Sequence, residues 1–363
     1  MDREEKLACL QLIRTPNTGP MTFSLLLQRY GSAIEALRAV PKLAKRGERT
    51  LNAAGRALAE AELQANEDGG ASLLFKGTGD YPARLAQFND APPVLSVRGS
   101  LYLLSRPSVG IVGARNASIN AQRLAQSLTE DLATEGYVIV SGLARGIDAT
   151  AHTGALAGGT VAVIIGGIDI IYPPENADLH ESIAETGLLV AEMPPGTQPT
   201  PRHFPIRNLI IGALALGVVL VEAGERSGSL ITAREAGERG GKVMAIPGSR
   251  LDPRSQGCNH LIREGAVLVQ EPSDVVELLS SFDGSPRSTF REPVSAFDSV
   301  PEDMSEAQPA DIASLLTRAP VGVDELIRQS GTSAAAVQLA LLELEIAGRL
   351  DRHAGGKVSL SSA

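Results

Sequence analysis

Short apolar runs alternate with amphipathic stretches through the middle of the chain. The runs VGIVG (109–113), VAVII (161–165) and VVLV (218–221) are largely apolar on both faces of an extended backbone, and each leads through a glycine into a helical pattern. Such runs are typical of buried parallel strands joined by helices. We therefore expect an extended Rossmann-like α/β fold, which is a doubly wound, mainly parallel sheet with helices on both faces.

The apolar runs and the amphipathic stretches give the expected bounds of the strands and of the helices that cover the sheet. We expect strands over 109–114, 138–143, 160–166, 188–192, 217–222, 242–247 and 266–270. We expect helices over 120–135, 147–157, 177–186, 206–216, 229–240, 258–264 and 273–281. Residues 95–98 follow two prolines and are expected to add an edge strand.

The flanking regions follow other patterns, and the chain divides into four parts. Residues 1–70 predict a small helical domain, similar to SAM or helix-hairpin-helix modules that touch nucleic-acid backbones, although a purely packing domain fits equally well. We expect residues 71–282 to form the Rossmann-like domain. Residues 283–308 lose all periodicity and predict a linker. Residues 309–363 predict a winged helix, whose third helix Thr332 or Ser333 would cap.

Composition indicates a globular protein without a membrane span. Hydrophobic residues make up 43% of the chain, and no apolar run approaches membrane-spanning length. The N-terminus is charged and has no apolar signal segment. Cys9 and Cys258 are the two cysteines of the sequence. We expect a cytoplasmic protein with neither a disulfide nor a cysteine-ligated metal.

Charge is distributed unevenly along the chain. The net charge is −9, and residues 109–282 carry 12 basic against 19 acidic side chains. However, seven of the basic residues lie in or beside the expected loops: Arg115, Arg145, Arg202, Arg207, Arg226, Arg250 and Arg254. An acidic body with a local basic rim favours a confined anionic ligand over a broad coating of duplex DNA.

Glycine- and serine-bearing turns follow several of the expected strands. The carboxyl ends of parallel strands share one edge of a sheet, and backbone N–H groups there bind phosphates at helix N-termini. We expect these turns to contact a nucleic-acid backbone through Gly113, Ser118, Ser141, Gly142, Gly146, Ser227, Gly228 and Ser229. Tight strand-to-helix turns, which every doubly wound protein needs, are the plainer explanation for each turn taken alone.

A basic and aromatic cluster lies just before one expected helix. Its members are Arg202, His203, Phe204, Arg207 and Asn208. Guanidinium groups suit phosphates, and an aromatic ring suits base stacking. Aromatic residues are only 3% of the chain. We therefore favour a single-strand contact here over the alternative that Phe204 belongs to the core.

Enzyme signatures are weak throughout the sequence. Residues 110–115 lack the glycine spacing of a dinucleotide-binding motif, so we expect no bound NAD. Residues 237–243 lack the glycine spacing of a P-loop, so we expect no ATPase activity. We expect no cofactor. Asp148 and His152 lie four apart, as two metal ligands or an acid–base pair would, but a structural hydrogen bond is favoured because no third ligand is visible. Cys258 is better explained as a small buried residue than as a nucleophile.

Long ordered segments resemble one known family. The segments VGARNAS (112–118), SGLARGIDATAHTGAL (141–156) and VVLVEAGERSGSLITAREAGERGGKVMAIPG (218–248) resemble the DNA-processing protein A family, DprA or Smf, and the similarity spans residues 76–282. The resemblance implies a homodimer that is not an enzyme. It would bind single-stranded DNA, protect DNA that enters the cell during natural transformation, and load RecA recombinase.

The resemblance also assigns roles to particular residues. It places a loop arginine at Arg115 and the basic-aromatic strand-binding loop at Arg202–Asn208. Two departures from the family pattern concern DNA affinity. Leu209 stands where an arginine commonly follows the Arg-Asn pair. Residues 119–122 (INAQ) replace the Tyr-Gly that usually comes after the serine.

Two other functions compete with strand binding. A Rossmann-like hydrolase of nucleotide glycosidic bonds would use an acid such as Glu222, but the glycine-rich loop of those enzymes is absent. A winged-helix transcription factor would need basic side chains on its recognition helix. Residues 333–347 instead contain no Lys or Arg and two glutamates, Glu343 and Glu345. We therefore expect the winged helix not to be the main DNA-binding element.

Overall fold

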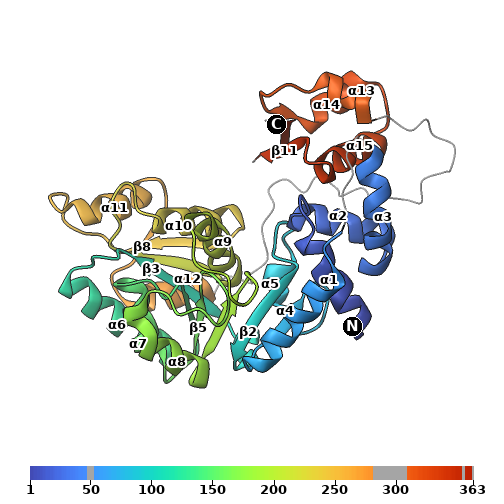
Figure 1. Cartoon of the computed structure of the whole chain (residues 1–363). Coiled ribbons are helices and arrows are strands. Elements are labelled where there is room, and N and C mark those ends of the chain that lie inside the picture. The colour runs from blue at the N-terminus through green and yellow to red at the C-terminus, as the bar shows by residue number, and fades with distance from the viewer. Residues whose placement is uncertain (47–52, 281–308, 354–355, 362–363) are drawn as a thin grey trace. The chain divides into compact units, whose positions relative to one another are not determined.

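A computed structural model describes residues 1–46, 53–280, 309–353 and 356–361 (Figure 1). The chain divides into two compact units, Met1–Ala61 with Phe290–Ala363, and Glu62–Thr289. The predicted linker over 283–308 lies outside the described residues. Among the described residues, no helix has the length and apolar character needed to cross a membrane.

The larger unit is built on a nine-stranded sheet with the order β1-β2-β6-β5-β4-β3-β7-β8-β9. The strands are β1 (Ser72–Phe75), β2 (Val94–Gly99), β3 (Ser108–Gly113), β4 (Val138–Ser141), β5 (Thr160–Val163), β6 (Leu188–Ala191), β7 (Gly217–Val221), β8 (Lys242–Ala245) and β9 (Val267–Leu268). Strands β3 to β9 are parallel, and β2 pairs antiparallel with β6. The predicted doubly wound, mainly parallel sheet is confirmed.

One edge of the sheet differs from the prediction. Residues 95–98 belong to β2, which lies inside the sheet because β1 pairs antiparallel with its outer side. The four residues of β1, SLLF, follow directly after a long helix and a Gly-Gly turn. A run this short carries too little periodicity to stand out in the sequence.

Helices cover both faces of the sheet (Figure 1). They are α5 (Ala83–Ala86), α6 (Ile119–Thr134), α7 (Ile147–Ala155), α8 (Ala177–Thr186), α9 (Phe204–Leu214), α10 (Ser229–Glu238), α11 (Gln256–Arg263) and α12 (Pro272–Ser280). Adjacent strand residues point to opposite faces. Ile111 therefore joins a core with α6, α7 and α12, whereas Val112 joins a core with α9 and α10. The continuous apolar runs arise because both faces of each strand are buried.

The smaller unit combines helices from the two ends of the chain. Its N-terminal helices are α1 (Arg3–Arg14), α2 (Pro20–Tyr30), α3 (Ala33–Arg46) and the start of α4 (Arg56–Asp68). The winged helix contains α13 (Pro309–Leu315), β10 (Val321–Gly322), α14 (Val323–Ser330), α15 (Ala334–Ile346), β11 (Leu350–His353) and β12 (Lys357–Leu360). Ser333 caps α15 by accepting a hydrogen bond from the Ala336 N–H at 3.1 Å, as predicted.

The helix in the recognition position, α15, is covered on two sides. Val337 and Leu341 pack in the core of the winged helix itself. Leu342 and Ile346 are also buried, and α15 contacts α2 and α3. The Asn17 Nδ2 group donates a hydrogen bond to the Ile346 carbonyl at 3.2 Å. A helix packed in this way has little free surface to offer to a DNA groove.

Candidate nucleic-acid interface

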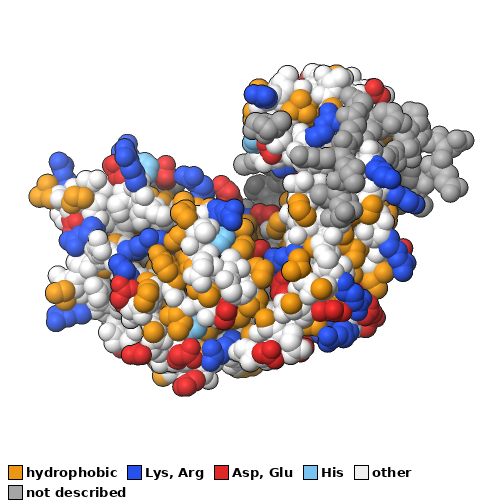
Figure 2. Space-filling model, viewed as in Figure 1, with side chains coloured by type: hydrophobic (Ala, Val, Ile, Leu, Met, Phe, Trp, Pro, Cys, Tyr) orange, Lys and Arg blue, Asp and Glu red, His pale blue; other side chains and the backbone are white. Residues whose placement is uncertain are grey.

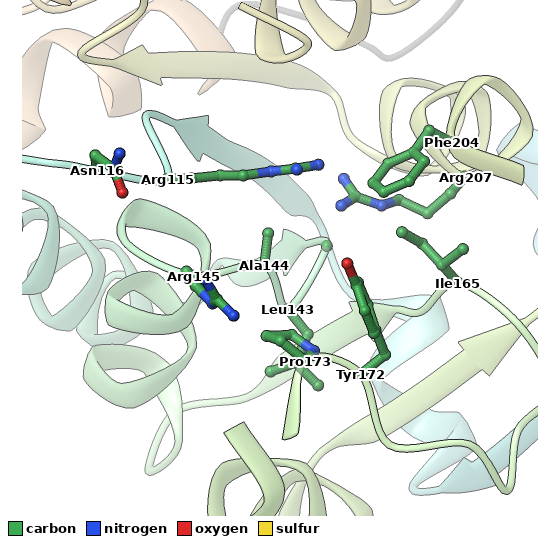
Figure 3. A pocket seen from close by; sticks show the side chains of 11 residues that line it. Arg115, Asn116, Leu143, Ala144, Arg145, Ile165, Tyr172, Pro173, Phe204 and Arg207 are labelled. Atoms are coloured by element: carbon green, nitrogen blue, oxygen red, sulfur yellow. The ribbon is translucent and has the colours of Figure 1, made fainter. Parts of the chain in front are cut away.

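A pocket of about 300 Å³ opens beside the carboxyl ends of β3, β4 and β5 (Figure 3). Loops after these three strands and the first turn of α9 supply its walls. The lining residues are Arg115, Asn116, Gly142, Leu143, Ala144, Arg145, Ile165, Tyr172, Pro173, Phe204 and Arg207. Open parallel sheets bind ligands at this edge. Five of the fifteen predicted site residues line the pocket, and the other ten lie outside its lining, as described below.

Two guanidinium groups lie over the ring of Phe204. The Arg115 Cζ atom is 5.0 Å from the ring centroid, and the Arg207 Cζ atom is 5.9 Å from it. Both distances fall within the range of cation–π attraction. Arg115 is exposed, whereas Arg207 is only 7% exposed. Phe204 therefore contacts one accessible cation and one buried cation.

Arg207 is held beneath the turn that follows β4. Its Nη2 atom lies 3.9 Å from the Asp148 Oδ2 atom, and its Nη1 group donates to Asn208 Oδ1 at 3.2 Å. A Cβ atom on Gly142 would lie 2.1 Å from Arg207 Nη1, so this close approach requires glycine. Burial raises the pKa of the Asp148 carboxyl above its usual value, and the Arg207 guanidinium opposes that rise.

His152 forms a structural hydrogen bond behind this ion pair. The Thr160 hydroxyl donates to the Ile139 carbonyl at 2.9 Å, so the His152 Nδ1 group donates to Thr160 Oγ1 at 2.7 Å. Burial, with a smaller effect of the Arg207 charge, lowers the pKa of His152 to about 3. The imidazole is therefore neutral at neutral pH. Its bond within the core is the structural role that the sequence favoured.

Cys258 is buried and its thiol Sγ donates to the Leu220 carbonyl at 3.8 Å. Burial raises the pKa of the thiol to about 11. The thiol is therefore protonated at neutral pH and is a poor nucleophile. Its interpretation as a small core residue is confirmed.

Gly146 allows the turns after β3 and β4 to pack together. Its φ is +73°, and a Cβ atom there would lie 2.3 Å from the Ala114 carbonyl oxygen. The next residue, Ile147, donates its N–H to that same carbonyl at 3.2 Å. Glycine at this position therefore brings the loop of Arg115 against the loop of Arg145.

Gly113 and Ser141 lie at the ends of their strands, within the fold. A Cβ atom on Gly113 would lie 1.9 Å from the Val221 carbonyl oxygen, so this glycine permits close strand packing. Ser141 is buried and donates its hydroxyl to the Ile111 carbonyl at 2.6 Å. Neither residue lines the pocket, although the sequence suggested that both contact a strand.

Ser118 binds a carboxylate of the chain itself. Its N–H and hydroxyl donate to the two Glu222 carboxylate oxygens at 2.8 and 2.6 Å, and its Oγ also accepts from Ala121 N–H. Glu222 adopts a left-handed φ of +50° at the end of β7. The crevice between β3 and β7, where the winding of the sheet reverses, is thus occupied at this helix N-terminus.

The remaining predicted residues lie around α9 and α10. His203 is buried, and its Nδ1 accepts from Thr200 N–H at 3.3 Å, while Arg202 is exposed. Burial lowers the pKa of His203, and the neighbouring Arg202 adds to this effect. The Ser227 and Ser229 hydroxyls lie 2.7 Å apart on either side of Gly228, in the turn after β7. These residues lie outside the pocket lining.

Sequence reasoning missed Tyr172 and its neighbour Pro173. Both line the pocket from the loop after β5, and Tyr172 is 44% exposed. The available signal was an aromatic residue followed by two prolines in a loop at the carboxyl edge. Such a loop has no periodicity, so nothing in the sequence shows that its aromatic ring reaches the pocket.

Basic side chains are exposed on the side of the larger unit that carries α6, α10 and α11, and Figure 2 shows Lys and Arg there among Asp and Glu. The exposed basic residues include Arg123, Arg226, Arg234, Arg250 and Arg254. Acidic residues such as Glu130, Glu225 and Glu264 are exposed in the same elements and loops, so this surface carries both charges.

These features define a Rossmann-fold protein that has a basic, aromatic pocket and carries both a helical module and a winged helix. Residues 72–280 match the family of DNA recombination-mediator protein A. Residues 3–65 match the DprA-like N-terminal HHH domain, and residues 298–356 match the DprA winged helix domain. The chain belongs to this DprA (Smf) family.

Two relatives match more than half of the chain. The chain is 48% identical over 198 residues to DNA processing protein DprA of Streptococcus pneumoniae. This match covers 54% of the chain and 70% of the relative. The chain is 38% identical over 290 residues to protein Smf of Escherichia coli, covering 78% and 76% of the two chains.

Two solved structures share the fold. DNA processing protein A of S. pneumoniae matches with a TM-score of 0.58 and 43% identity, over 61% of this chain and 77% of that one. The Helicobacter pylori protein, which has a unique single-stranded DNA binding mode, matches with a TM-score of 0.54 and 29% identity. That match covers 58% of this chain and 96% of the H. pylori chain.

Proposed function

We propose that this chain binds single-stranded DNA in the pocket at the carboxyl edge of β3, β4 and β5. The observation that carries the proposal is the pair of guanidinium groups, Arg115 and Arg207, over the Phe204 ring. Guanidinium groups suit the phosphates of a strand, and an aromatic pocket lining suits its bases. The single-stranded DNA binding of the H. pylori relative supports the same ligand.

The pocket favours a single strand over a duplex. Its volume of about 300 Å³ lies at the small end of ligand pockets, and Arg207 is buried within it. A duplex holds its bases in a stack and presents only its backbone and grooves. Bases that are free of a partner can enter such a pocket individually.

A titration with labelled oligonucleotides tests this function. We expect single strands to bind more tightly than duplexes of equal length. The logarithm of the affinity should fall with the logarithm of the salt concentration, with a slope of about −0.7 for each phosphate contacted. Three or four contacts would give a slope of roughly −2 to −3. Equal affinity for both forms, or binding that is independent of salt, would contradict the proposal.

We further propose that the bound strand is protected and passed to RecA recombinase in the cytoplasm, as the family membership suggests. The chain would act without catalysing a reaction and without a cofactor. Glu222, the acid that a nucleotide hydrolase would use, accepts two hydrogen bonds from Ser118 and does not line the pocket. Faster RecA assembly on coated single strands, with no base release from nucleotides, is the expected result.

A homodimer through the β9 end of the sheet completes the proposal. Within the described residues, β9 pairs with β8 alone, and its Val267 and Leu268 are 38% and 42% exposed. An unpaired, apolar edge strand is prone to associate with another chain. Light scattering should give the mass of two chains at micromolar concentration. Replacing Val267 and Leu268 with lysine should give the mass of one.

A further inference from the structure

Tyr172 presents an aromatic ring on the wall of the pocket that lies across from Phe204. It comes from the loop between β5 and α8, whereas Phe204 begins α9. Figure 3 shows its hydroxyl directed toward the space beside Arg115 and Arg207. Tyr172 is 44% exposed. Part of its ring is therefore accessible from the pocket.

The loop that carries Tyr172 is fastened at several points. The Asn176 Nδ2 group donates to the Leu143 carbonyl at 2.9 Å, and the Arg145 guanidinium lies 2.5 Å from a Glu175 carboxylate oxygen. On the other side, both Asp169 carboxylate oxygens accept from the Gly196 N–H. A ring held by such bonds loses little conformational entropy when a ligand packs on it.

The two aromatic rings of the pocket have different surroundings. Phe204 already has the guanidinium groups of Arg115 and Arg207 over its ring. No cation lies within stacking range of Tyr172 among the residues that the structure describes, and burial does not hide its ring. The free aromatic surface in the pocket is therefore that of Tyr172.

We propose that Tyr172 is the base-contacting residue of the pocket, where one nucleobase of the bound strand stacks on its ring. This inference rests on the proposed function and adds to it the part of the strand that the pocket recognises. Arg115 would bind the adjoining phosphate. The pocket has room for one base rather than a run of stacked bases, since its volume is about 300 Å³.

Abasic DNA separates base contact from backbone contact. An oligothymidine and an all-abasic strand of the same length carry equal charge but differ in their bases. We expect Tyr172→Ala to weaken oligothymidine binding by about 5- to 150-fold, which corresponds to ~1–3 kcal/mol for one stacked base. Affinity for the abasic strand and the salt slope should stay as in the unmodified chain, because stacking releases no counterions.

Two variants provide matched controls. Tyr172→Phe keeps the ring and should retain oligothymidine affinity. Tyr102→Ala removes another exposed tyrosine, which is 71% exposed and does not line the pocket, and should change nothing. Thermal melting of all three variants should match the unmodified chain because both side chains lie outside the core.

Intrinsic fluorescence gives an independent measurement. The sequence has five tyrosines and no tryptophan, so tyrosine dominates the emission of the chain. Oligothymidine should quench this emission by stacking on Tyr172, whereas the abasic strand should not. In Tyr172→Phe the quenching should disappear although binding persists.

Several outcomes would overturn the inference and leave the proposed function standing. One is an equal loss of affinity for both strands in Tyr172→Ala, and another is quenching that survives in Tyr172→Phe. Oligothymidine binding that Tyr172→Ala leaves intact would have the same meaning. Failure of the unmodified chain to bind either strand would instead remove the proposed function itself.

Discussion

The guanidinium carbon of Arg115 lies 5.0 Å from the ring centroid of Phe204, although the two residues follow different strands and lie far apart in the sequence. Arg115 is in the turn after β3, and Phe204 begins α9, which leads into β7. Strands β3 to β7 run parallel in one sheet, so α9, which connects β6 to β7, starts at the carboxyl edge where β3 also ends. The contact arises because the turn after a strand and the N-terminus of a crossover helix share that edge.

Replacing Arg115 with alanine should weaken single-strand binding by about 1–3 kcal/mol, because a charge-assisted phosphate contact is lost. The salt slope should also become shallower by about 0.7. Fluorescence anisotropy over a series of salt concentrations measures both effects. Arg123→Ala is the control, since Arg123 is exposed on α6 and does not line the pocket. An equal loss in both variants would mean that general charge, and not the pocket, binds the strand.

Gly146→Ala should lower both stability and DNA affinity. The new Cβ atom would lie 2.3 Å from the Ala114 carbonyl oxygen at a φ of +73°, which would force the loops of Arg115 and Arg145 apart. Gly136→Ala has a similar φ of +92° but open space around it. It should therefore cost only the left-handed strain of about 1–2 kcal/mol.

Urea unfolding and strand binding of these two glycine variants measure the difference. Gly146→Ala should be the less stable variant and should lose affinity, whereas Gly136→Ala should bind as the unmodified chain does. Equal effects on stability would show that the contact with Ala114 has no energetic weight.

The stability of the larger unit should fall in acid because of His152. Its pKa is lowered to about 3 in the fold, whereas the unfolded chain takes up the proton near pH 6.5. The unfolded state therefore binds more protons between these values, and acidification favours it. The slope contributed by this histidine approaches about 1.4 kcal/mol per pH unit below pH 6.5.

Urea unfolding at several pH values between 7 and 5 tests this slope, because the histidine of the unfolded chain titrates in this interval. His152→Gln keeps a polar side chain near Thr160 but cannot titrate, so its stability should depend less on pH over the same interval. An unchanged dependence would assign the acid sensitivity to other groups.

Truncation after Asp283 should leave single-strand affinity within a few-fold of the full chain. Residues 309–363 carry five basic and six acidic side chains, which provides no basic patch for DNA, and α15 is covered on two sides. Anisotropy with the shortened chain measures the affinity. Loss of most of the binding would return the DNA contact to the winged helix.

The strands and helices of the sheet were predictable because burial on both faces leaves continuous apolar runs. Each predicted run from 109 to 270 overlaps a strand of the sheet. The predictions extended several strands too far, as at 138–143 and 160–166, because buried turn residues such as Leu143 and Ile165 are also apolar. An apolar residue marks burial, but it does not require an extended backbone.

The site was less predictable because a sequence does not show which way a loop side chain points. Arg115, Arg145, Phe204 and Arg207 do meet in one pocket, since they lie in two loops and the first turn of α9 at one edge of the sheet. Ser118 and Ser141 were predicted to contact DNA because they follow strands at this edge, and their hydroxyls donate to the Glu222 carboxylate and the Ile111 carbonyl. Tyr172 reaches the pocket through a loop path that no periodicity describes.

The hydrogen bond between Asn17 and Ile346 joins residues that are 329 positions apart. During synthesis, residues 1–61 leave the ribosome long before α15 exists, so the surfaces of α2 and α3 that contact α15 stay uncovered while the whole sheet is made. Contacts of such long sequence separation form late and slowly. The surfaces of α2 and α3 are therefore covered only after the winged helix has been made. A chain whose synthesis stops before α15 keeps these surfaces exposed.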